Sequence, residues 1–342
     1  MSDDYLWDGS GTPDPEVQRL ERALAPLRYN DRPRWVQKDP PYIRRGGAEG
    51  PPKGGHYVRA WGPLAAMAAV VTLAVSVVWR TPAASWEVNA LNGSPRVGAH
   101  AVAASAKLAV GQTLTTDASS RARIAVGAIG NVTVEPNSRV RFVETSADHH
   151  QLSLQRGTIH AIITAPPGQF VVDTPSATAT DLGCEYTLHV DDEGSGRLSV
   201  DVGWVAFESH GRESFVPGGA SSSMNAVYGP GTPSFDDATP AFHAALDRFD
   251  FGRAEVRPEA LQTVFREAHH RDALTLWHLL SRVDARDRGD VFAALAARIP
   301  PPTGVTKDAV LRLDRAALDA WWESLELGDV TFWRSWLATS KR

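Results

Sequence analysis

The sequence predicts a mainly β domain of short antiparallel or stacked strands, an α-helical C-terminal domain after it, and one transmembrane helix before it. Three patterns in the 342 residues predict this fold class. Residues 88–226 alternate apolar and polar side chains, residues 241–342 repeat apolar residues at helical spacing, and residues 61–79 carry no charge. Because no helix-length segment interrupts the alternating region, a parallel α/β sheet is excluded. A sandwich, a barrel and a β-helix-like stack all fit the pattern.

The uncharged stretch WGPLAAMAAVVTLAVSVVW, residues 61–79, predicts a transmembrane helix at 61–80. At about 1.5 Å per residue it would extend roughly 28 Å, close to the hydrocarbon thickness of a bilayer. Trp61 and Trp79 stand where interfacial aromatic residues belong, and Arg59 and Arg80 flank the segment, so these four residues are the predicted membrane anchor. A buried core helix and a cleavable signal peptide are the alternatives. The length of residues 1–60 favours an uncleaved anchor over a signal peptide.

Flanking charge predicts the orientation of the anchor. Residues 32–60 contain two acidic residues and seven basic ones, namely Arg32, Arg34, Lys38, Arg44, Arg45, Lys53 and Arg59. Residues 81–110 contain only Arg96 and Lys107 as basic residues. The positive-inside rule therefore predicts a single-pass protein of the inner (cytoplasmic) membrane, with a cytoplasmic N-terminus and its bulk in the periplasm.

Residues 1–60 are expected to form a cytoplasmic tail with one short amphipathic helix. Between residues 14 and 28 the apolar positions recur at helical spacing, and they are Val17, Leu20, Leu24 and Leu27. An isolated helix this short is marginal in water, so this apolar stripe is the candidate partner-binding surface. The partner would be a cytoplasmic protein, a second copy of the chain or the membrane surface; a frayed tail without a partner is the alternative. Residues 30–56 are rich in Pro, Gly and Arg and predict a disordered linker.

Within residues 88–226, short alternating segments are separated by turn residues. The pattern predicts a turn at 155–157, between one alternating segment that includes Leu152 and a second that includes Ile159. It also places Leu198, Val200 and Val202 on one face of a strand, with a β-bulge at Gly203–Trp204, where the alternation changes phase.

Five pieces of this region resemble, in order, the FecR domain family, the membrane-anchored extracytoplasmic regulators typified by the iron-dicitrate sensor. The matching stretches are VGQTLTTDASSRARIAV (110–126), VTVEPNSRVRFVE (132–144), LSLQRGTIHAII (152–163), FVVDTPSATATDLGCEYTLHV (170–190) and LSVDVGWVAFES (198–209). The resemblance implies a β-rich extracytoplasmic module in a signalling or envelope-associated protein, without a catalytic role. Two features differ from the family pattern. Cys184 replaces the usual threonine after the late glycine, and residues 1–60 lack the larger anti-sigma segment with its recurring tryptophans.

After a linker predicted at 227–240, the periodicity becomes helical. Helices are expected at 240–251, 258–268, 271–283, 288–299, within 306–325 and at 329–337, which together form a small antiparallel array over 241–342. The tryptophans of this region have the spacing of helix core residues rather than that of a ligand-binding aromatic cluster. They are Trp277, Trp321, Trp322, Trp333 and Trp336.

Cys184 is the single cysteine, which excludes an intrachain disulfide and the usual cysteine-based zinc sites. In TATDLGCEYTLHV (178–190) it shares the even-numbered face with Tyr186, Leu188 and Val190, whereas Glu185 and His189 point the other way. We therefore expect a buried and unreactive thiol after a turn at 181–183.

The sequence contains no constellation typical of an enzyme. The usual nucleophile, phosphate-loop, dinucleotide and metalloprotease motifs are absent, and a net charge of −5 argues against nucleic-acid binding. The adjacent pairs His149–His150 and His269–His270 diverge on a strand or a helix, so neither predicts a metal site. Asp201 and Glu208 have no partner at a sequence spacing typical of a catalytic or metal site, and we expect both to be solvated. We expect no catalytic residue, cofactor or metal.

Two functions fit these observations. The first is a membrane-anchored regulator or sensor that binds a protein partner in the periplasm and signals inward to a cytoplasmic protein such as a sigma factor. The second is an envelope structural or glycan- or protein-binding module with no signalling role.

Overall fold

The computed structural model describes residues 84–209 and 211–328. The chain divides into two compact units, Met1–Ala68 and Ala69–Arg342, and the described residues all belong to the second. The predicted membrane helix and the predicted cytoplasmic tail lie outside the described residues. Within the described ranges, no helix has both the length and the apolar character needed to cross a membrane.

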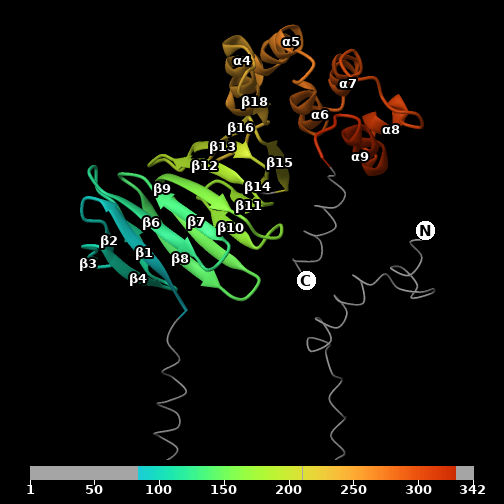
Figure 1. Ribbon diagram of the computed structural model, residues 1–342. Coiled ribbons are helices and arrows are strands. Elements are labelled where there is room, and N and C mark those ends of the chain that lie inside the picture. The colour runs from blue at the N-terminus through green and yellow to red at the C-terminus, as the bar shows by residue number, and fades with distance from the viewer. Residues whose placement is uncertain (1–83, 210, 329–342) are drawn as a thin grey trace, which may run out of the picture. The chain divides into compact units, whose positions relative to one another are not determined.

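The strands of the described region form two sheets that share the long strand β9, His150–Ile163 (Figure 1). Sheet A has, in spatial order, β4 (Ser105–Ala109), β1 (Ser85–Asn92), β6 (Arg121–Val126), β7 (Gly130–Val134), β9, β12 (Glu185–Val190), β13 (Gly196–Val202) and β16 (Ala220–Asn225), with β17 (Gly229–Pro230) and β18 (Ser234–Phe235) beside β16. Sheet B has β3 (His100–Ala101), β2 (Arg96–Val97), β5 (Thr113–Thr115), β8 (Arg139–Thr145), β9, β10 (Phe170–Asp173), β11 (Thr178–Asp181), β14 (Trp204–Ser209) and β15 (Arg212–Pro217). Strands β9 and β10 pair in parallel, and the other ladders of the described region are antiparallel. The prediction of a mainly β domain is confirmed.

Strand β9 passes from sheet B to sheet A without a turn. Its first half pairs with β8 and its second half with β7 and β12. Between them Gly157 has φ +91°, and a Cβ at this position would lie 2.4 Å from the Cα of Ser138. The turn predicted at 155–157 is therefore wrong. The change of phase between Leu154 and Ile159 marks a change of sheet within one strand, accompanied by a shift in the β8–β9 register.

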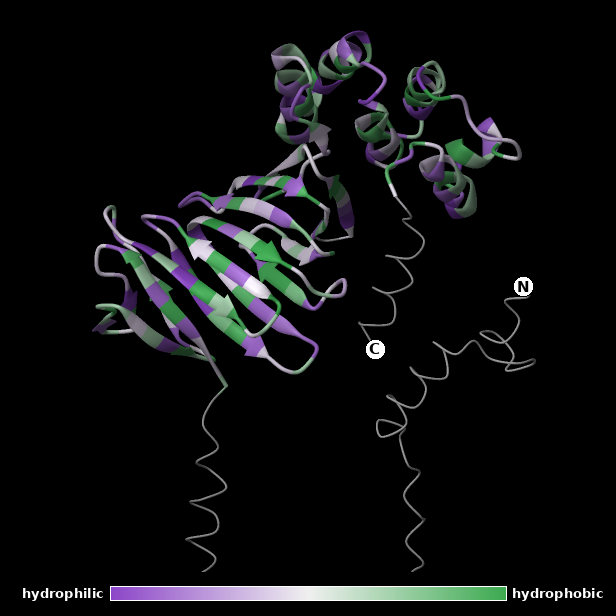
Figure 2. Cartoon of the chain, in the orientation of Figure 1, coloured by the Kyte–Doolittle hydropathy of each residue, from purple (hydrophilic) through white to green (hydrophobic). Residues whose placement is uncertain are grey.

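The two sheets enclose the core of the β domain. Alternate residues of the strands are fully buried, among them Ile124, Val132, Phe142, Leu152 and Ile159, and Figure 2 shows the alternation of hydrophobic and hydrophilic residues along the strands. Trp86 of β1 in sheet A stacks on Phe142 of β8 in sheet B, with ring centroids 3.9 Å apart. This contact joins the inner faces of the two sheets.

The irregularity near the end of β13 lies earlier than the sequence predicts. In the β12–β13 ladder Glu185 pairs with Val202 and Tyr186 with Val200, so Asp201 is the additional residue of a β-bulge. Both Asp201 and Val202 consequently point outward, and Val202 is 61% exposed rather than buried beside Val200. Gly203, with φ +80°, instead marks the passage of the chain from β13 in sheet A to β14 in sheet B.

The C-terminal region contains six α-helices within the described residues, which confirms the predicted helical region. They are α4 (Pro240–Phe251), α5 (Arg257–Glu267), α6 (Ala273–Arg282), α7 (Arg288–Ala296), α8 (Lys307–Leu311) and α9 (Arg315–Glu323), with a short 3-10 turn η2 at Ala254–Val256. The segment 306–325 forms two helices because Leu313 adopts φ +57° and Asp314 caps α9 by accepting from the Ala317 N–H at 2.9 Å. The helix predicted at 329–337 lies outside the described residues.

The helical region packs directly on sheet B. Trp322 of α9 is fully buried and contacts Trp277 of α6, with ring centroids 4.7 Å apart, and also Phe215 of β15. The described tryptophans Trp277, Trp321 and Trp322 thus belong to the core, whereas Trp333 and Trp336 lie outside the described residues. Segment 227–240, predicted as a linker, contributes β17 and β18 to sheet A.

Candidate functional site

The predicted site residues lie outside the described part of the chain. These are the anchor residues Arg59, Trp61, Trp79 and Arg80 and the apolar stripe of Val17, Leu20, Leu24 and Leu27. Their roles therefore remain predictions. The described residues instead contain three clusters of polar side chains that could carry function.

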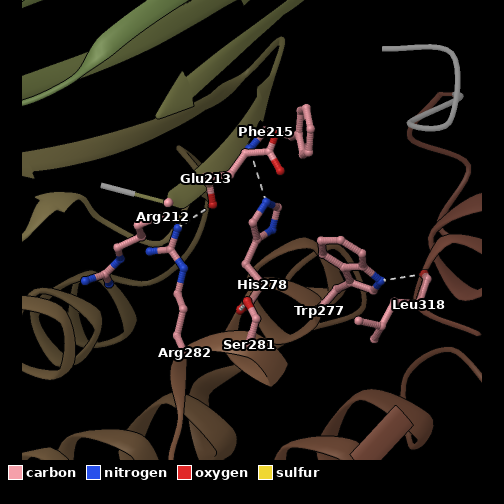
Figure 3. Close-up of a pocket in the computed structure, with 9 residues that line it drawn as sticks. Arg212, Glu213, Phe215, Trp277, His278, Ser281, Arg282 and Leu318 are labelled. Atoms are coloured by element: carbon pink, nitrogen blue, oxygen red, sulfur yellow. Dashed lines mark hydrogen bonds between the residues drawn. The ribbon is translucent and has the colours of Figure 1, made fainter. Parts of the chain in front are cut away.

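The first cluster lies in a pocket of about 490 Å³ between β15 and α6 (Figure 3). Arg282 is buried there and donates to the Glu213 carbonyl at 2.9 Å, the Ser214 hydroxyl at 2.6 Å and the Thr232 hydroxyl at 3.0 Å. Burial lowers the pKa of Arg282 to about 9, and the nearby Asp250 carboxylate opposes that shift. Asp250 lies 3.7 Å from Arg282, is only 2% exposed and also forms an ion pair with Arg212.

His278 in the same pocket joins α6 to β15. Its Nε2 accepts from the Phe215 N–H at 3.1 Å (Figure 3). Its Nδ1 lies 2.9 Å from the Leu274 carbonyl. A carbonyl can only accept and an N–H can only donate, so these bonds assign a neutral imidazole with its proton on Nδ1. Arg282 and His278 of α6 thus hold the helical region on sheet B, which favours a structural role for these two side chains.

The second cluster surrounds Cys184. The thiol is 4% exposed and donates to the carboxylate of Asp181, which also accepts from the Gly183 N–H at 2.7 Å. Burial raises the pKa of Asp181 to about 6, and burial together with the Asp181 charge raises the pKa of the Cys184 thiol well above its usual range. The prediction of a buried thiol is confirmed. The role of Asp181 cannot be read from strand alternation, because its side chain folds back across the turn onto Cys184.

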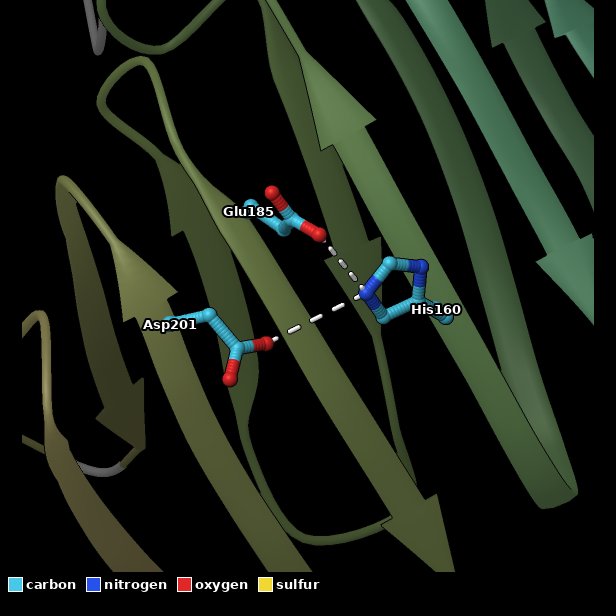
Figure 4. A group of neighbouring side chains, drawn as sticks. All are labelled: His160, Glu185 and Asp201. Carbon is cyan, nitrogen blue, oxygen red and sulfur yellow. Dashed lines mark ion pairs between the residues drawn. The ribbon is translucent and has the colours of Figure 1, made fainter.

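The third cluster lies on the outward face of sheet A (Figure 4). His160 Nε2 is 3.3 Å from the Glu185 carboxylate and 3.9 Å from that of Asp201. The ligand atoms of these three half-exposed or exposed residues lie within 4.8 Å of one another, and the cluster is the group in the described ranges that could hold a metal ion. Asp201 is exposed, as predicted for a solvated carboxylate, but His160 lies 3.9 Å from its carboxylate. Its neighbours come from other strands, so no local sequence spacing could reveal them.

An apolar surface adjoins this third cluster. Ile162 is 39% exposed and Val202 is 61% exposed. They line a shallow hollow together with Ala165, Pro166 and Glu185. The hollow offers a mixed apolar and acidic surface to a ligand.

These features define a two-sheet β domain with a helical region packed on it. Residues 112–205 match the sequence model of the family described as FecR protein, which confirms the resemblance found in the sequence. The match runs from just before β5 to the second residue of β14 and so includes both halves of β9.

Two crystal structures of a protein from Parabacteroides distasonis ATCC 8503, proposed to be an anti-sigma factor, are similar to part of the chain. Each shows 15% sequence identity and a TM-score of 0.33 and covers 39% of this chain. The chain spans 63% and 62% of the length of those two structures. A TM-score this low does not establish a shared overall fold. No curated protein matches the chain.

Proposed function

We propose that the protein is a non-enzymatic, membrane-anchored regulator whose β domain binds a protein partner in the periplasm and whose N-terminal tail passes the state of that domain inward. The match of residues 112–205 to the FecR protein family carries this proposal. The resemblance implies a regulatory extracytoplasmic module, and the uncharged segment 61–79 supplies an anchor of suitable length.

The tail would act through its apolar stripe. Leu20 and Leu24 lie at the centre of the predicted amphipathic helix, where they would bind a groove on a cytoplasmic protein. A sigma factor is the partner to test first, because the β domain resembles the FecR family, whose regulators carry a cytoplasmic anti-sigma segment.

The proposal is tested in cells by replacing the apolar stripe. We expect the double variant Leu20→Ser with Leu24→Ser in the full chain to lose recovery of a sigma factor in a pull-down and to change transcription of genes dependent on it. The matched control, Gln18→Ser with Arg22→Ser, alters the polar face of the same predicted helix and should leave both readouts unchanged.

The alternative, an envelope structural or glycan- or protein-binding module, gives the opposite result. In that case deletion of residues 1–30 would leave transcription unchanged, whereas deletion of the β domain would damage the envelope. The exposed Ile162 and Val202 beside the acidic cluster favour a binding surface on the β domain under either function.

A further inference from the structure

We propose that His160, Glu185 and Asp201 bind one divalent transition-metal ion, with Zn²⁺ as the representative, on the outward face of sheet A. This inference concerns the β domain alone and stands whether or not the protein signals to a sigma factor. It rests on strand register, on ligand spacing and on the chemistry of the three side chains (Figure 4).

The strand register places the three residues together. In the β9–β12 ladder Glu185 pairs with Ile162 and Thr187 with His160, so His160 and Glu185 are diagonal neighbours on the same face. Diagonal partners lie about 7–8 Å apart at the backbone, within reach of long side chains. On the other side of β12, Glu185 pairs with Val202, the residue after Asp201.

The β-bulge in β13 adds the third ligand. In a regular strand Asp201 and Val202 would face opposite sides of the sheet. Because the extra residue turns both outward, the Asp201 carboxylate reaches His160 while Val202 remains beside Glu185. Bulges commonly redirect a side chain at a functional site, and this one completes a group of three ligands on the middle strands of a sheet.

The spacing of the ligand atoms suits a small divalent ion. Bonds of about 2.0–2.2 Å to a tetrahedral ion put neighbouring ligand atoms roughly 3.3–3.6 Å apart. The His160–Glu185 separation of 3.3 Å falls within that range, and the His160–Asp201 separation of 3.9 Å needs only a small side-chain rotation.

The ligand types select the class of ion. Two carboxylates balance the charge of a divalent cation, and a neutral imidazole favours Zn²⁺ and related ions over Ca²⁺ and Mg²⁺, which prefer oxygen ligands. Three protein ligands leave a fourth position for water or for a group of a bound molecule. Since Glu185 also lines the hollow with Ile162 and Val202, that fourth position lies next to an apolar surface.

Calorimetric titration of ZnCl₂ into the metal-stripped full chain tests the proposal. We expect one saturable site with a Kd tighter than about 1 mM. In His160→Ala and in the isosteric Asp201→Asn and Glu185→Gln variants the affinity should fall at least about 10-fold, since even outer-shell partners of a metal contribute 10–100-fold. Ca²⁺ in moderate excess should not displace Zn²⁺.

His189→Ala is the matched control. His189 is an exposed histidine of β12 on the same outward face as Glu185, but it lies outside the cluster. Its replacement should change the affinity less than about 2-fold, because it supplies no ligand. Absence of saturable binding, or equal affinity in the wild-type chain and the His160→Ala variant, would overturn the proposal and leave the cluster as a surface ion pair.

Discussion

The Cys184 thiol illustrates how surroundings decide the role of a reactive residue type. It is almost fully buried and hydrogen-bonded to Asp181, and a negative charge beside a thiol opposes formation of the thiolate. We expect a thiol reagent to label Cys184 in the folded chain at least about 100-fold more slowly than in urea, because only the exposed thiolate reacts. The absorbance of the coloured thiolate that a disulfide reagent releases on labelling, followed at pH 8, measures both rates. Labelling at similar rates would contradict the burial described above.

Asp181 predicts a pH dependence of stability. Burial raises its pKa in the folded state to about 6 from an ordinary value of 3.8, so folding favours the protonated carboxyl. The stabilisation is complete below about pH 3.8 and is lost as the pH rises to about 6, and it amounts to about 3 kcal/mol for a shift of this size.

The Asp181→Asn variant isolates this contribution. Asparagine keeps an oxygen that can accept from the Gly183 N–H but cannot ionise. Relative to the wild-type chain, we expect the variant to gain stability progressively between pH 4 and pH 6 and to keep that gain at higher pH. Urea unfolding at a series of pH values measures the difference. A difference that does not vary with pH would show that Asp181 ionises at its ordinary pKa.

At the scale of a single strand, Gly157 allows β9 to change sheets. An alanine there would combine a left-handed backbone with overlap between its Cβ and the Ser138 backbone. Gly219 provides a control, because its φ of +78° is similar but nothing lies within 4 Å of a Cβ there. Left-handed backbone costs a non-glycine residue about 1–2 kcal/mol. We expect Gly219→Ala to lose about that much stability and Gly157→Ala to lose a further 1–3 kcal/mol from overpacking.

Thermal or urea unfolding of the two variants side by side separates strain from steric overlap. Equal losses would mean that the backbone at Ser138 moves aside without penalty and that the crossing does not depend on a glycine.

Strand β9 and the end of β13 also show what a local pattern can and cannot predict. The buried faces follow from alternation, since Leu152, Leu154 and Ile159 are all fully buried as expected. A change of phase, however, has the same appearance whether the chain turns, bulges or moves to another sheet. Choosing among these requires knowledge of the partner strand, which one sequence does not contain. For this reason the turn at 155–157 was wrong and Val202 was assigned to the wrong face.

At the scale of the whole described region, the same limit applies to the sites. Burial of Cys184 and of Trp322 could be predicted because each follows from the periodicity of its own element. The group of His160, Glu185 and Asp201 comes from three strands, and the network of Asp250 with Arg282 joins two helices to a strand. Charged residues far apart in sequence have no periodicity in common, so contacts of this kind appear only in the folded chain.

The network at Asp250 makes a prediction about how the helical region is held on the β domain. Asp250 of α4 accepts from the Thr232 N–H at 2.6 Å and neutralises both Arg282 of α6 and Arg212 of β15. Removing one partner of a buried ion pair leaves the other charge buried without compensation, which costs about 3–5 kcal/mol. We expect Asp250→Ala to lose that much free energy of unfolding.

The size of this loss follows from the state of Arg282. Burial already lowers the pKa of its guanidinium to about 9 while Asp250 opposes the shift, so removing Asp250 leaves a cation in a site that disfavours charge. Asp247→Ala is the matched control, because Asp247 lies on α4 as well but is exposed, and its loss should change stability by less than about 0.5 kcal/mol. Urea unfolding followed by tryptophan fluorescence suits the measurement, since Trp277 and Trp322 lie at the junction. A loss below about 1 kcal/mol in Asp250→Ala would show that Arg282 finds solvation without its partner, and that the apolar contacts of Trp322 hold the helical region in place by themselves.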